Sequence, residues 1–305
     1  MPQPDAATEA FEAHRPRLAR LAYRMLGSVA EAEDVVQDAW LRWRQVDRTT
    51  VLADGPFLSR IVTRLCLDRM KSARARRETY VGAWLPEPLL QAAAPEGEDE
   101  PDRDELTLTL MLALERLSPL ERAAFLLHDV FGAPMEEVAA TLEREPTAVR
   151  QLASRARRHV QSARPRYRVP QEEGDRIAAA FFEASSSGDT AALRTMLAEG
   201  VTIRSDGGGK VLAFLNPIRG VARALRLYEN LARKYGRGSF VMMRPMWIDG
   251  LPGYASLERG EVLQTTALEI EDGRIVGVYI TRNPDKLKHV AAVLAEDCGG
   301  AAMAQ

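Results

Sequence analysis

At 305 residues, with 46% hydrophobic and 28% charged side chains, the chain has the composition of a soluble protein and room for two or three domains. Its two cysteines stand far apart and exclude a disulfide framework. No apolar run approaches the roughly 18 residues of a membrane span, so we expect a cytoplasmic protein without a membrane segment. The net charge is only -2, but the charged residues are unevenly distributed along the chain. Basic residues are concentrated in 60–77 and 150–168, and acidic residues are concentrated between these two segments.

Residues 5 to 80 predict a helical module. Gly27 ends its first helix, and Ser28 opens the next with Glu31 placed to close a capping box. Apolar side chains repeat at helical spacing in the first helix and form one buried stripe: Leu18, Leu21, Ala22 and Met25.

The second helix of this module is predicted over EAEDVVQDAWLRW, residues 31–43. Its core face takes Val35, Val36 and Ala39, joined by Trp40 and Trp43 in a combination that the pattern leaves open. Its outer face is polar and acidic and includes Asp34, Gln37 and Asp38.

The third helix starts near Pro56 and has two faces. Leu58, Val62 and Leu65 point to a core. Basic side chains recur on another face, here called the α3 stripe: Arg60, Arg64, Lys71 and Arg74. Such a stripe suits the phosphates of a nucleic acid, although an ordinary solvated face gives the same pattern.

Residues 81–105 predict a linker of unusual content. Its second half is acidic, whereas its first half carries Trp84, Leu85 and Pro86 in the string WLPEP. The prolines keep this string extended, so it loses little conformational entropy when it docks on another part of the protein. An exposed tryptophan and leucine would form an apolar surface patch, which soluble proteins avoid. We therefore expect these three residues to be buried.

Residues 106 to 168 predict a helix-turn-helix. Ser118 and Glu121 form a second capping box, Gly132 ends that helix, and Pro146 opens the last one. The last helix buries an apolar stripe and exposes a polar set, here called the recognition face: Arg150, Gln151, Ser154, Arg155 and Arg158. A helix of this kind fits the major groove of DNA, although a charged helix of an ordinary bundle shares the pattern.

Residues 172 to 296 predict helices followed by strands. Two helices separated by a Ser/Gly turn are expected over 174–200, and a third over 219–235. The β-rich strings SFVMMRPMWID, GYASLERGEVLQTTALEIED and RIVGVYITR follow, with Asp272 and Gly273 as a tight hairpin turn. This order predicts an α+β domain with a curved antiparallel sheet.

Two short strings in this domain stand out. DGGGK comprises Asp206, Gly207, Gly208, Gly209 and Lys210, and NPDKL comprises Asn283, Pro284, Asp285, Lys286 and Leu287. The first lacks the outer Gly and the Ser or Thr of a phosphate loop, and its glycines suit a tight turn with Asp206 and Lys210 at the surface. In the second, Asn283 caps a helix, which does not explain Lys286 or Leu287.

Taken together, these strings resemble a known family. AEDVVQDAWLRW and GPFLSRIVTRLCLDRMKSARAR are similar to the polymerase-binding and promoter-melting helices of sigma region 2, and LSPLERAAFLLHDVFG with VRQLASRARR resembles sigma region 4. WLPEP, DGGGK and NPDKL resemble the signatures of extracytoplasmic-function sigma factors with a fused C-terminal SnoaL-like domain. The resemblance implies a multidomain chain: two all-α sigma domains, a region 2 helical bundle and a region 4 helix-turn-helix, followed by an α+β SnoaL-like cone.

The resemblance also implies partners and roles. The clamp region of core RNA polymerase would be bound by the helix that carries Asp34, Gln37, Asp38, Trp40 and Trp43. The α3 stripe would hold the -10 element of promoter DNA, and the recognition face would read the -35 element. Phe57 stands where family members often carry a tryptophan, so we expect it to pack. The alternative is a stand-alone helix-turn-helix regulator with a ligand-sensing domain, which would bind DNA without polymerase.

Cones of this kind usually enclose a pocket, and enzymes built on them position acids or bases there. The sequence does not group the available side chains: Asp206, Asp249, Tyr254, Tyr279 and His289. We therefore expect no enzymatic activity, no cofactor and no metal. Whether the pocket takes a small molecule stays open.

Our hypothesis for the linker is that Trp84, Leu85 and Pro86 insert between the first module and the cone, with DGGGK or NPDKL forming part of their seat. The cone would then fix the relative orientation of the two DNA-binding modules and regulate the chain from within. In the alternative, Trp84 closes the core of the first module itself.

Overall fold

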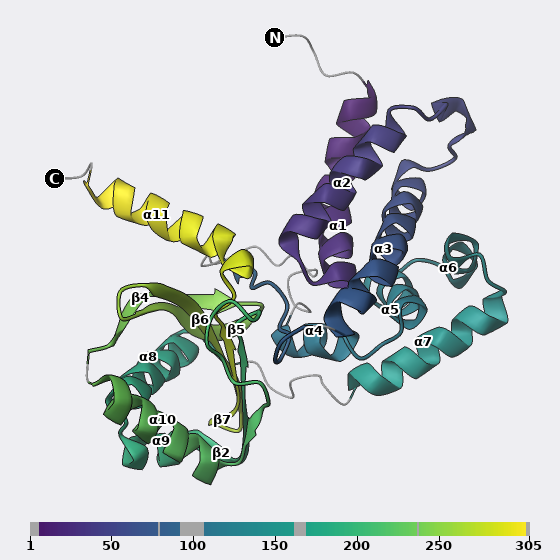
Figure 1. Cartoon of the computed structure of the whole chain (residues 1–305). Helices are drawn as coiled ribbons and strands as arrows, with labels where there is room; N and C mark the ends of the chain where they lie inside the picture. Colours follow the sequence, from purple (N-terminus) through teal and green to yellow (C-terminus); the bar gives the residue numbers. More distant parts are fainter. Residues whose placement is uncertain (1–5, 79, 92–106, 162–168, 237, 303–305) are drawn as a thin grey trace. The chain divides into compact units, whose positions relative to one another are not determined.

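The computed structural model of the chain describes residues 6–78, 80–91, 107–161, 169–236 and 238–302. It divides into two compact units (Figure 1). The first unit combines 1–78 with 110–164, and the second combines 79–109 with 165–305. The acidic half of the linker, over 92–106, lies outside the described residues. Within the described residues, each helix falls short of the length or apolarity that crossing a bilayer requires.

The N-terminal part of the first unit is a helical bundle. Its elements are α1 (Ala6–Leu26), α2 (Val29–Trp43), the 3₁₀ turn η1 (Arg48–Thr50) and α3 (Asp54–Glu78). The predicted boundaries are confirmed, because Gly27 has a φ of 70° and the Ser28 side chain accepts a hydrogen bond from the Glu31 backbone N–H. The apolar stripes of the helices meet in one core, in which Met25, Val35 and Leu58 are fully buried.

The C-terminal part of the first unit is a helix-turn-helix, as predicted. Its elements are α4 (Leu108–Leu114), which begins in the second unit, α5 (Pro119–Phe125), the π-helical turn η2 (Leu126–Val130), α6 (Met135–Leu142) and α7 (Pro146–Gln161). Both halves of the capping box of Ser118 and Glu121 are formed. Glu143 ends α6 with a φ of 53°, which makes the tight turn into α7.

The second unit contains helices and a mixed sheet. Its helices are α8 (Gln171–Ser187), α9 (Thr190–Met196), α10 (Val221–Tyr235), the 3₁₀ turn η3 (Pro284–Lys286) and α11 (Lys288–Ala302). Its strands are β1 (Leu90–Gln91), β2 (Leu197–Asp206), β3 (Ile218–Arg219), β4 (Phe240–Ile248), β5 (Leu251–Glu258), β6 (Val262–Glu271) and β7 (Arg274–Thr281). The strand order is β1-β4-β5-β6-β7-β2-β3, so a strand from the linker forms one edge.

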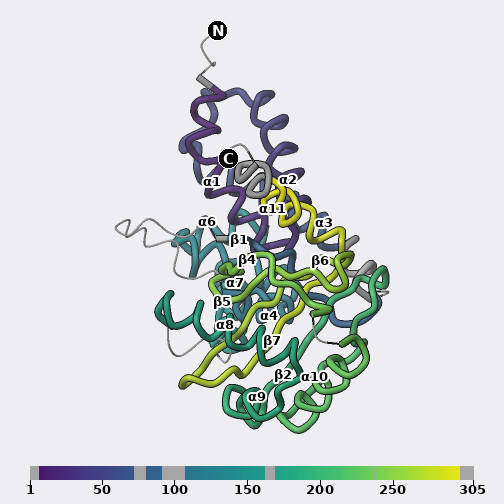
Figure 2. The backbone as a smooth tube through the Cα atoms, turned by 90° about the vertical axis from the view of Figure 1, so that its left-hand side faces the viewer, coloured from purple at the N-terminus to yellow at the C-terminus, as the bar shows by residue number. Residues whose placement is uncertain are grey.

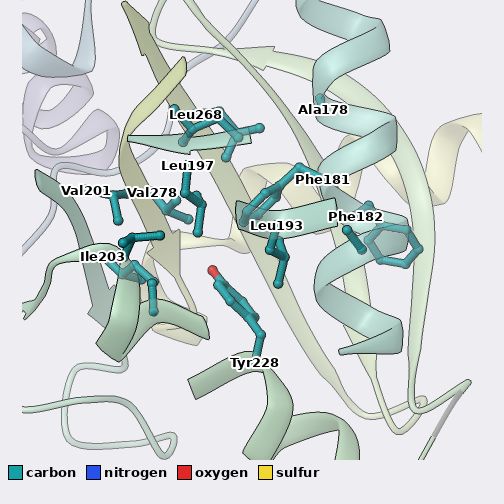
Figure 3. Packing of buried hydrophobic residues seen from close by; sticks show 14 of the residues in the cluster. Ala178, Phe181, Phe182, Leu193, Leu197, Val201, Ile203, Tyr228, Leu268 and Val278 are labelled. Carbon is teal, nitrogen blue, oxygen red and sulfur yellow. The ribbon is translucent and has the colours of Figure 1, made fainter. Parts of the chain in front are cut away.

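The sheet curves around a helical layer. Figures 1 and 2 show α8, α9 and α10 within this curve, with α9 and α10 side by side. Phe181, Leu193, Ile203 and Tyr228 pack between the two layers (Figure 3). The predicted hairpin is confirmed, since Glu271 pairs with Arg274 across a two-residue turn.

Two expectations for this unit are wrong. The second predicted helix does not reach Gly200, because Leu197 onward forms β2, which pairs with β7 some 75 residues later in the chain. The sheet is not wholly antiparallel, since the β2–β7 pair is parallel. Pairing with a distant strand overrides the local helical pattern here.

Candidate functional site

The recognition face is open to solvent in the described structure. All five of its side chains are exposed on α7, while Val149, Ala153 and Val160 bury the opposite side. Nε of Arg155 lies 3.3 Å from the Glu121 carboxylate, and the Arg155 side chain is half-exposed, so the guanidinium can exchange this partner for a phosphate or a base edge.

The α3 stripe is less uniform than predicted. Arg64 donates to Glu143, which directly follows α6, over 2.6 Å, and this bond joins the two sigma-like parts of the first unit. Lys71 is exposed and pairs with Asp68 at 2.8 Å, whereas Arg60 is half-buried. The side chain of Arg74 lies outside the described residues.

The polar face of α2 is tied to α3 by a residue that the sequence pattern did not single out. Arg69 donates to Asp34 over 3.3 Å and to Asp38 over 2.9 Å. These hydrogen bonds raise the pKa of Arg69 although its partial burial lowers it, and the guanidinium stays charged. Gln37 is exposed beside them. The face is therefore accessible and held in one orientation.

The assignment of Trp43 to polymerase binding is corrected. Trp43 is fully buried, donates its indole N–H to the Ala7 carbonyl over 2.9 Å, and packs against Phe57 at 5.9 Å between ring centroids. An indole held in this way belongs to the bundle core, because its one polar atom is already satisfied. Trp40 is half-buried against Phe11 and keeps part of its surface on the α2 face.

In the second unit, Asp206 binds the linker. Its carboxylate is fully buried at the end of β2 and accepts hydrogen bonds from the Tyr80 hydroxyl at 2.5 Å and the Leu85 backbone N–H at 2.9 Å. The Gly208 N–H at 3.0 Å and the Lys286 ammonium at 2.8 Å complete its shell. A buried carboxylate needs such a shell, so Asp206 fixes the linker on the cone. The expectation that it lies at the surface is wrong.

Lys286 is the counter-ion of Asp206 and also contacts the linker directly. Its ammonium donates to the Leu85 carbonyl and lies 4.2 Å from the ring centroid of Trp84 and 5.1 Å from that of Tyr80. A cation over aromatic faces and beside a carboxylate is stabilised by both. Trp84 thus packs on the cone within the second unit, and its side chain is half-buried.

The three glycines of DGGGK stand where neighbouring atoms leave little or no room for a side chain. A side chain on Gly207 would lie 2.1 Å from the Val211 carbonyl oxygen, and one on Gly208 would lie 2.3 Å from the Asn283 amide nitrogen. Gly209 has a φ of 72°, and a side chain on it would lie 3.3 Å from Cβ of Val81 in the linker. The glycine loop therefore brings the backbone against both NPDKL and the linker. We call Asp206, this loop, Asn283 and Lys286 the linker seat.

NPDKL forms the other wall of the linker seat. Asn283 accepts from the Asp285 N–H at 3.1 Å, which is the predicted cap, and its amide donates to the Tyr80 hydroxyl over 3.0 Å. Pro284 takes the first position of the turn η3, and Leu287 is buried at 2% exposure. Asp285 pairs with Lys210 at 2.5 Å on the surface. DGGGK and NPDKL are thus brought together around the WLPEP string.

The expected burial of Leu85 and Pro86 is confirmed, whereas Trp84 is only half-buried. Sequence reasoning missed Tyr80 and the linker contact of His289, whose Nε2 contacts the Pro88 carbonyl. Burial lowers the pKa of His289, but the contacts with Glu87 and Pro88 outweigh it and raise the pKa above its ordinary value. Tyr80 was missed because a lone tyrosine before a linker carries no local signal.

The backbone of Asp249 is bonded to the chain on both sides of the acidic half of the linker. Its backbone N–H donates to the Leu89 carbonyl over 2.9 Å, and its own carbonyl accepts from the Leu108 N–H at 2.8 Å. Next to these bonds, Leu90 of β1 pairs with Ile248 of β4. Two residues that are far apart in the sequence are therefore held at one point of the cone.

The residues named as possible catalysts are not grouped for chemistry. Asp206 and Asp249 hold the linker, and the Tyr279 hydroxyl donates to Glu269 over 2.5 Å. Burial raises the pKa of Tyr254 to about 12, so this hydroxyl stays protonated. Among the described residues, no group of His, Cys, Asp and Glu is arranged to hold a metal ion.

The comparisons with known proteins agree with this architecture. Residues 10–76 match the family model of Sigma-70 region 2, and residues 107–160 match that of Sigma-70, region 4. The chain is 37% identical over 294 residues to the ECF RNA polymerase sigma factor SigJ of Mycobacterium tuberculosis, which covers 90% of this chain and 91% of the relative. It is 32% identical over 300 residues to the probable ECF RNA polymerase sigma factor SigI of the same species, covering 96% and 99%.

A solved structure is similar over the same extent. The crystal structure of Mycobacterium tuberculosis extracytoplasmic function sigma factor SigJ has 30% sequence identity and a TM-score of 0.71, and covers 92% of this chain and 98% of that one. The predicted fold, two helical sigma domains followed by an α+β domain, is confirmed. A stand-alone helix-turn-helix regulator is not favoured, because region 2 is present as well. The chain belongs to the ECF RNA polymerase sigma factors, which direct promoter-specific initiation of transcription and in general are not enzymes.

Proposed function

We propose that the α2 face docks on the clamp of core RNA polymerase in the cytoplasm, that the α3 stripe holds the unpaired -10 strand, and that the recognition face reads the -35 element. We further propose that the C-terminal domain modulates initiation by holding the linker in its seat. The observation that carries this proposal is the bonding of buried Asp206 to Tyr80 and Leu85 of the linker.

The packing within the first unit supports a need for rearrangement on the promoter. Arg64 of α3 and Glu143 of α6 are in contact, so the two sigma regions touch. Modules of this size are roughly 25–30 Å across, and two in contact span about 60 Å at most. The -10 and -35 elements lie roughly 25 base pairs apart, or about 85 Å along straight duplex. The two regions must therefore separate to bind both elements at once.

The linker limits how far the two sigma regions can separate while it is bonded to the C-terminal domain. With Leu89 and Leu108 both bonded to Asp249, only residues 80–89 contribute reach, about 35 Å when fully extended. A released linker over 79–107 spans up to about 100 Å. The seated linker thus favours the closed form of the first unit, and its release favours the form that can engage both promoter elements.

In vitro transcription with bacterial core polymerase tests this function. We expect the intact chain to initiate from specific promoters, and Asp206→Asn to raise the yield severalfold because it weakens the seat. Asp285→Asn is the matched control, since its pair with Lys210 is half-exposed and contributes little. A chain that ends near Val169 lacks the linker seat, so we expect it to raise the transcription yield as well.

Two results would count against the proposal in different ways. Absence of initiation by the intact chain with core polymerase would remove the polymerase-dependent roles of the α2 face and the α3 stripe. Unchanged initiation by both Asp206→Asn and the shortened chain would leave those roles standing and remove the modulation by the linker seat.

A further inference from the structure

The outer side of α10 carries a surface that neither the linker seat nor the sigma regions use. One side of this helix packs into the domain through Val221, Ala224 and Tyr228. By the helical repeat, the opposite side is exposed, and we call its members the α10 face: Arg223, Arg226, Asn230, Arg233 and Lys234. These are cations and one amide, so the face is positively charged along its whole length.

The contacts of these side chains leave their charges uncompensated. Nε of Arg226 donates to a backbone carbonyl of its own helix over 3.4 Å, and Arg233 donates to the Asn230 side chain over 2.5 Å. The ammonium of Lys234 lies 4.9 Å from the ring centroid of Tyr235. Each of these partners is neutral, so the cations remain available to an anion.

The folding of α10 does not account for the cations at its start. The described first turn of this helix contains Arg223 and no acidic residue, although the positive end of the helix dipole favours acids there. Arg223 and Arg226 are three residues apart, so like charges are also neighbours on the helix surface. Arg233 and Lys234, in contrast, suit the last turn. The first two cations therefore cost the domain stability, and such departures from local preference are expected at functional sites.

The positive surface continues past both ends of the helix. At the C-terminal end, the Arg259 guanidinium lies 5.1 Å from the centroid of the Tyr235 ring that Lys234 also contacts. Arg259 is exposed, and Glu258 lies 3.5 Å from it. At the N-terminal end, Arg219 is exposed on β3. The fold thus adds cations from two other segments to those of the α10 face.

The α10 face matches duplex DNA in length and charge. From Arg223 to Lys234 it runs about 16 Å along the helix axis. Phosphates of one DNA strand follow one another at roughly 3.4 Å along the duplex axis, so the face lies beside about five of them. Arginine and lysine bind phosphate oxygens by charge-assisted hydrogen bonds, and an asparagine amide donates to them as well. The face lacks the large apolar side chains with which a helix enters a bilayer.

We propose that the α10 face binds the phosphate backbone of duplex DNA beside the -35 element, in addition to the contacts of the α3 stripe and the recognition face. The contact adds affinity without reading sequence, because the phosphates are the same at every base pair. It gives the C-terminal domain a role in DNA binding that is separate from the linker seat.

The length of the chain limits where on the promoter this contact falls. Residues 162–170 connect α7 to α8, and a segment of this length spans at most about 30 Å. A domain of the size of 169–302 is roughly 35 Å across. The α10 face therefore reaches DNA within about 65 Å of the recognition helix, or roughly 20 base pairs. This step rests on the proposed reading of the -35 element by the recognition face.

Fluorescence anisotropy with the full chain and a labelled duplex that lacks a promoter tests the contact over a range of salt concentrations. Each lost phosphate contact lowers the slope of log K against log salt concentration by about 0.9. The combined variant Arg223→Gln, Arg226→Gln and Arg233→Gln should therefore have a slope shallower by roughly 2 to 3, and about fivefold weaker binding or more at low salt.

A matched pair of single variants separates the α10 face from the charge of the domain as a whole. Arg226→Gln should lower the slope by about 1. Arg176→Gln removes the same charge from an exposed position of α8 and should leave the slope unchanged. Circular dichroism checks that each variant is folded, which is expected because the substituted side chains are exposed and glutamine suits a helix.

A photo-cross-linker locates the contact on a promoter. We expect p-benzoylphenylalanine in place of Asn230, at the centre of the α10 face, to cross-link to duplex DNA within about 20 base pairs of the -35 element when the chain is bound with core polymerase. The same group in place of Arg176 should not reach DNA.

Two results would overturn the proposal. One is a slope and an affinity of the combined variant equal to those of the parent. The other is the absence of cross-links from position 230 to DNA, whether or not a polymerase subunit or a second copy of the chain is labelled instead. The anisotropy measurement uses neither polymerase nor promoter, so its failure leaves the linker seat and the sigma regions to the transcription test, and failure there leaves this contact to the salt titration.

Discussion

Arg122 in the first unit and Asp206 in the second are buried charges that join segments far apart in the sequence, and the two are satisfied differently. In the first unit, Arg122 of α5 is 1% exposed and donates to the carbonyls of Met25 at 2.7 Å and Leu114 at 2.9 Å, with Glu115 at 2.7 Å. In the second, Asp206 is fully buried and binds the linker and Lys286.

The difference decides which contact can act as a switch. The partners of Arg122 belong to helices of the folded core, and a guanidinium cannot lose its charge, so breaking this contact means unfolding. Half of the shell of Asp206 comes from a linker, and Gly208 and Lys286 remain with the carboxylate when the linker leaves. Arg122 is therefore structural, whereas the Asp206 seat is suited to open and close.

The largest effect is expected at Arg122. Replacement by Leu leaves two carbonyls and Glu115 without their buried donor and should lower the free energy of unfolding of the first unit by about 3–5 kcal/mol. Urea unfolding followed by far-UV circular dichroism measures this. Arg116→Leu on the exposed side of the same segment should stay within about 0.5 kcal/mol of the parent, and equal effects of the two would contradict the comparison.

Removal of the Asp206 carboxylate should have the next largest effect. A hydrogen bond to a charged group contributes about 1.5–3 kcal/mol, so Asp206→Ala should speed amide exchange at Leu85 by roughly ten- to a hundredfold or more. Hydrogen exchange read by mass spectrometry over the linker detects the change. Asp285→Ala should leave the exchange rate nearly unchanged, and parallel behaviour of both variants would argue against a separable seat.

Gly208 tests how closely the loop approaches NPDKL. Gly208→Ala introduces a methyl group 2.3 Å from Asn283 in addition to the strain of a φ of 61°, and should cost about 2 kcal/mol. Gly260→Ala has a similar φ of 70° with open space around it and should cost about 1 kcal/mol. The difference between the two thermal unfolding shifts isolates the close approach, and identical shifts would show that the loop can move aside.

The smallest effect is expected from pH. The pKa of His289 is raised above its ordinary value of 6.5, so protonation favours the seated linker. This stabilisation is complete below the ordinary pKa and is lost as the pH rises through the raised folded value. Linker exchange should therefore speed up across that window in the parent and not in His289→Gln. If the linker exchange rate of His289→Gln still depended on pH across this window, another titrating group would be responsible.

The sequence by itself determined the features that depend on neighbouring residues. The capping box of Ser118 and Glu121, the N-cap of Ser28 and the Asp272–Gly273 turn follow from side chains within one or two turns of each. The three strings WLPEP, DGGGK and NPDKL were visible as departures from the local pattern. Their physical causes act over a few residues, so the local pattern is sufficient to predict them.

Only the tertiary structure decided which of these residues are buried and which of the strings are in contact with one another. Trp43 and Trp40 are equally apolar in sequence, and the packing of α1 buries one and leaves the other partly open. Asp206 reads as a surface residue beside glycines until Tyr80 and Leu85, more than 120 residues earlier, close over it. The reason is that burial and charge pairing depend on surfaces supplied by distant parts of the chain, which a local pattern does not contain.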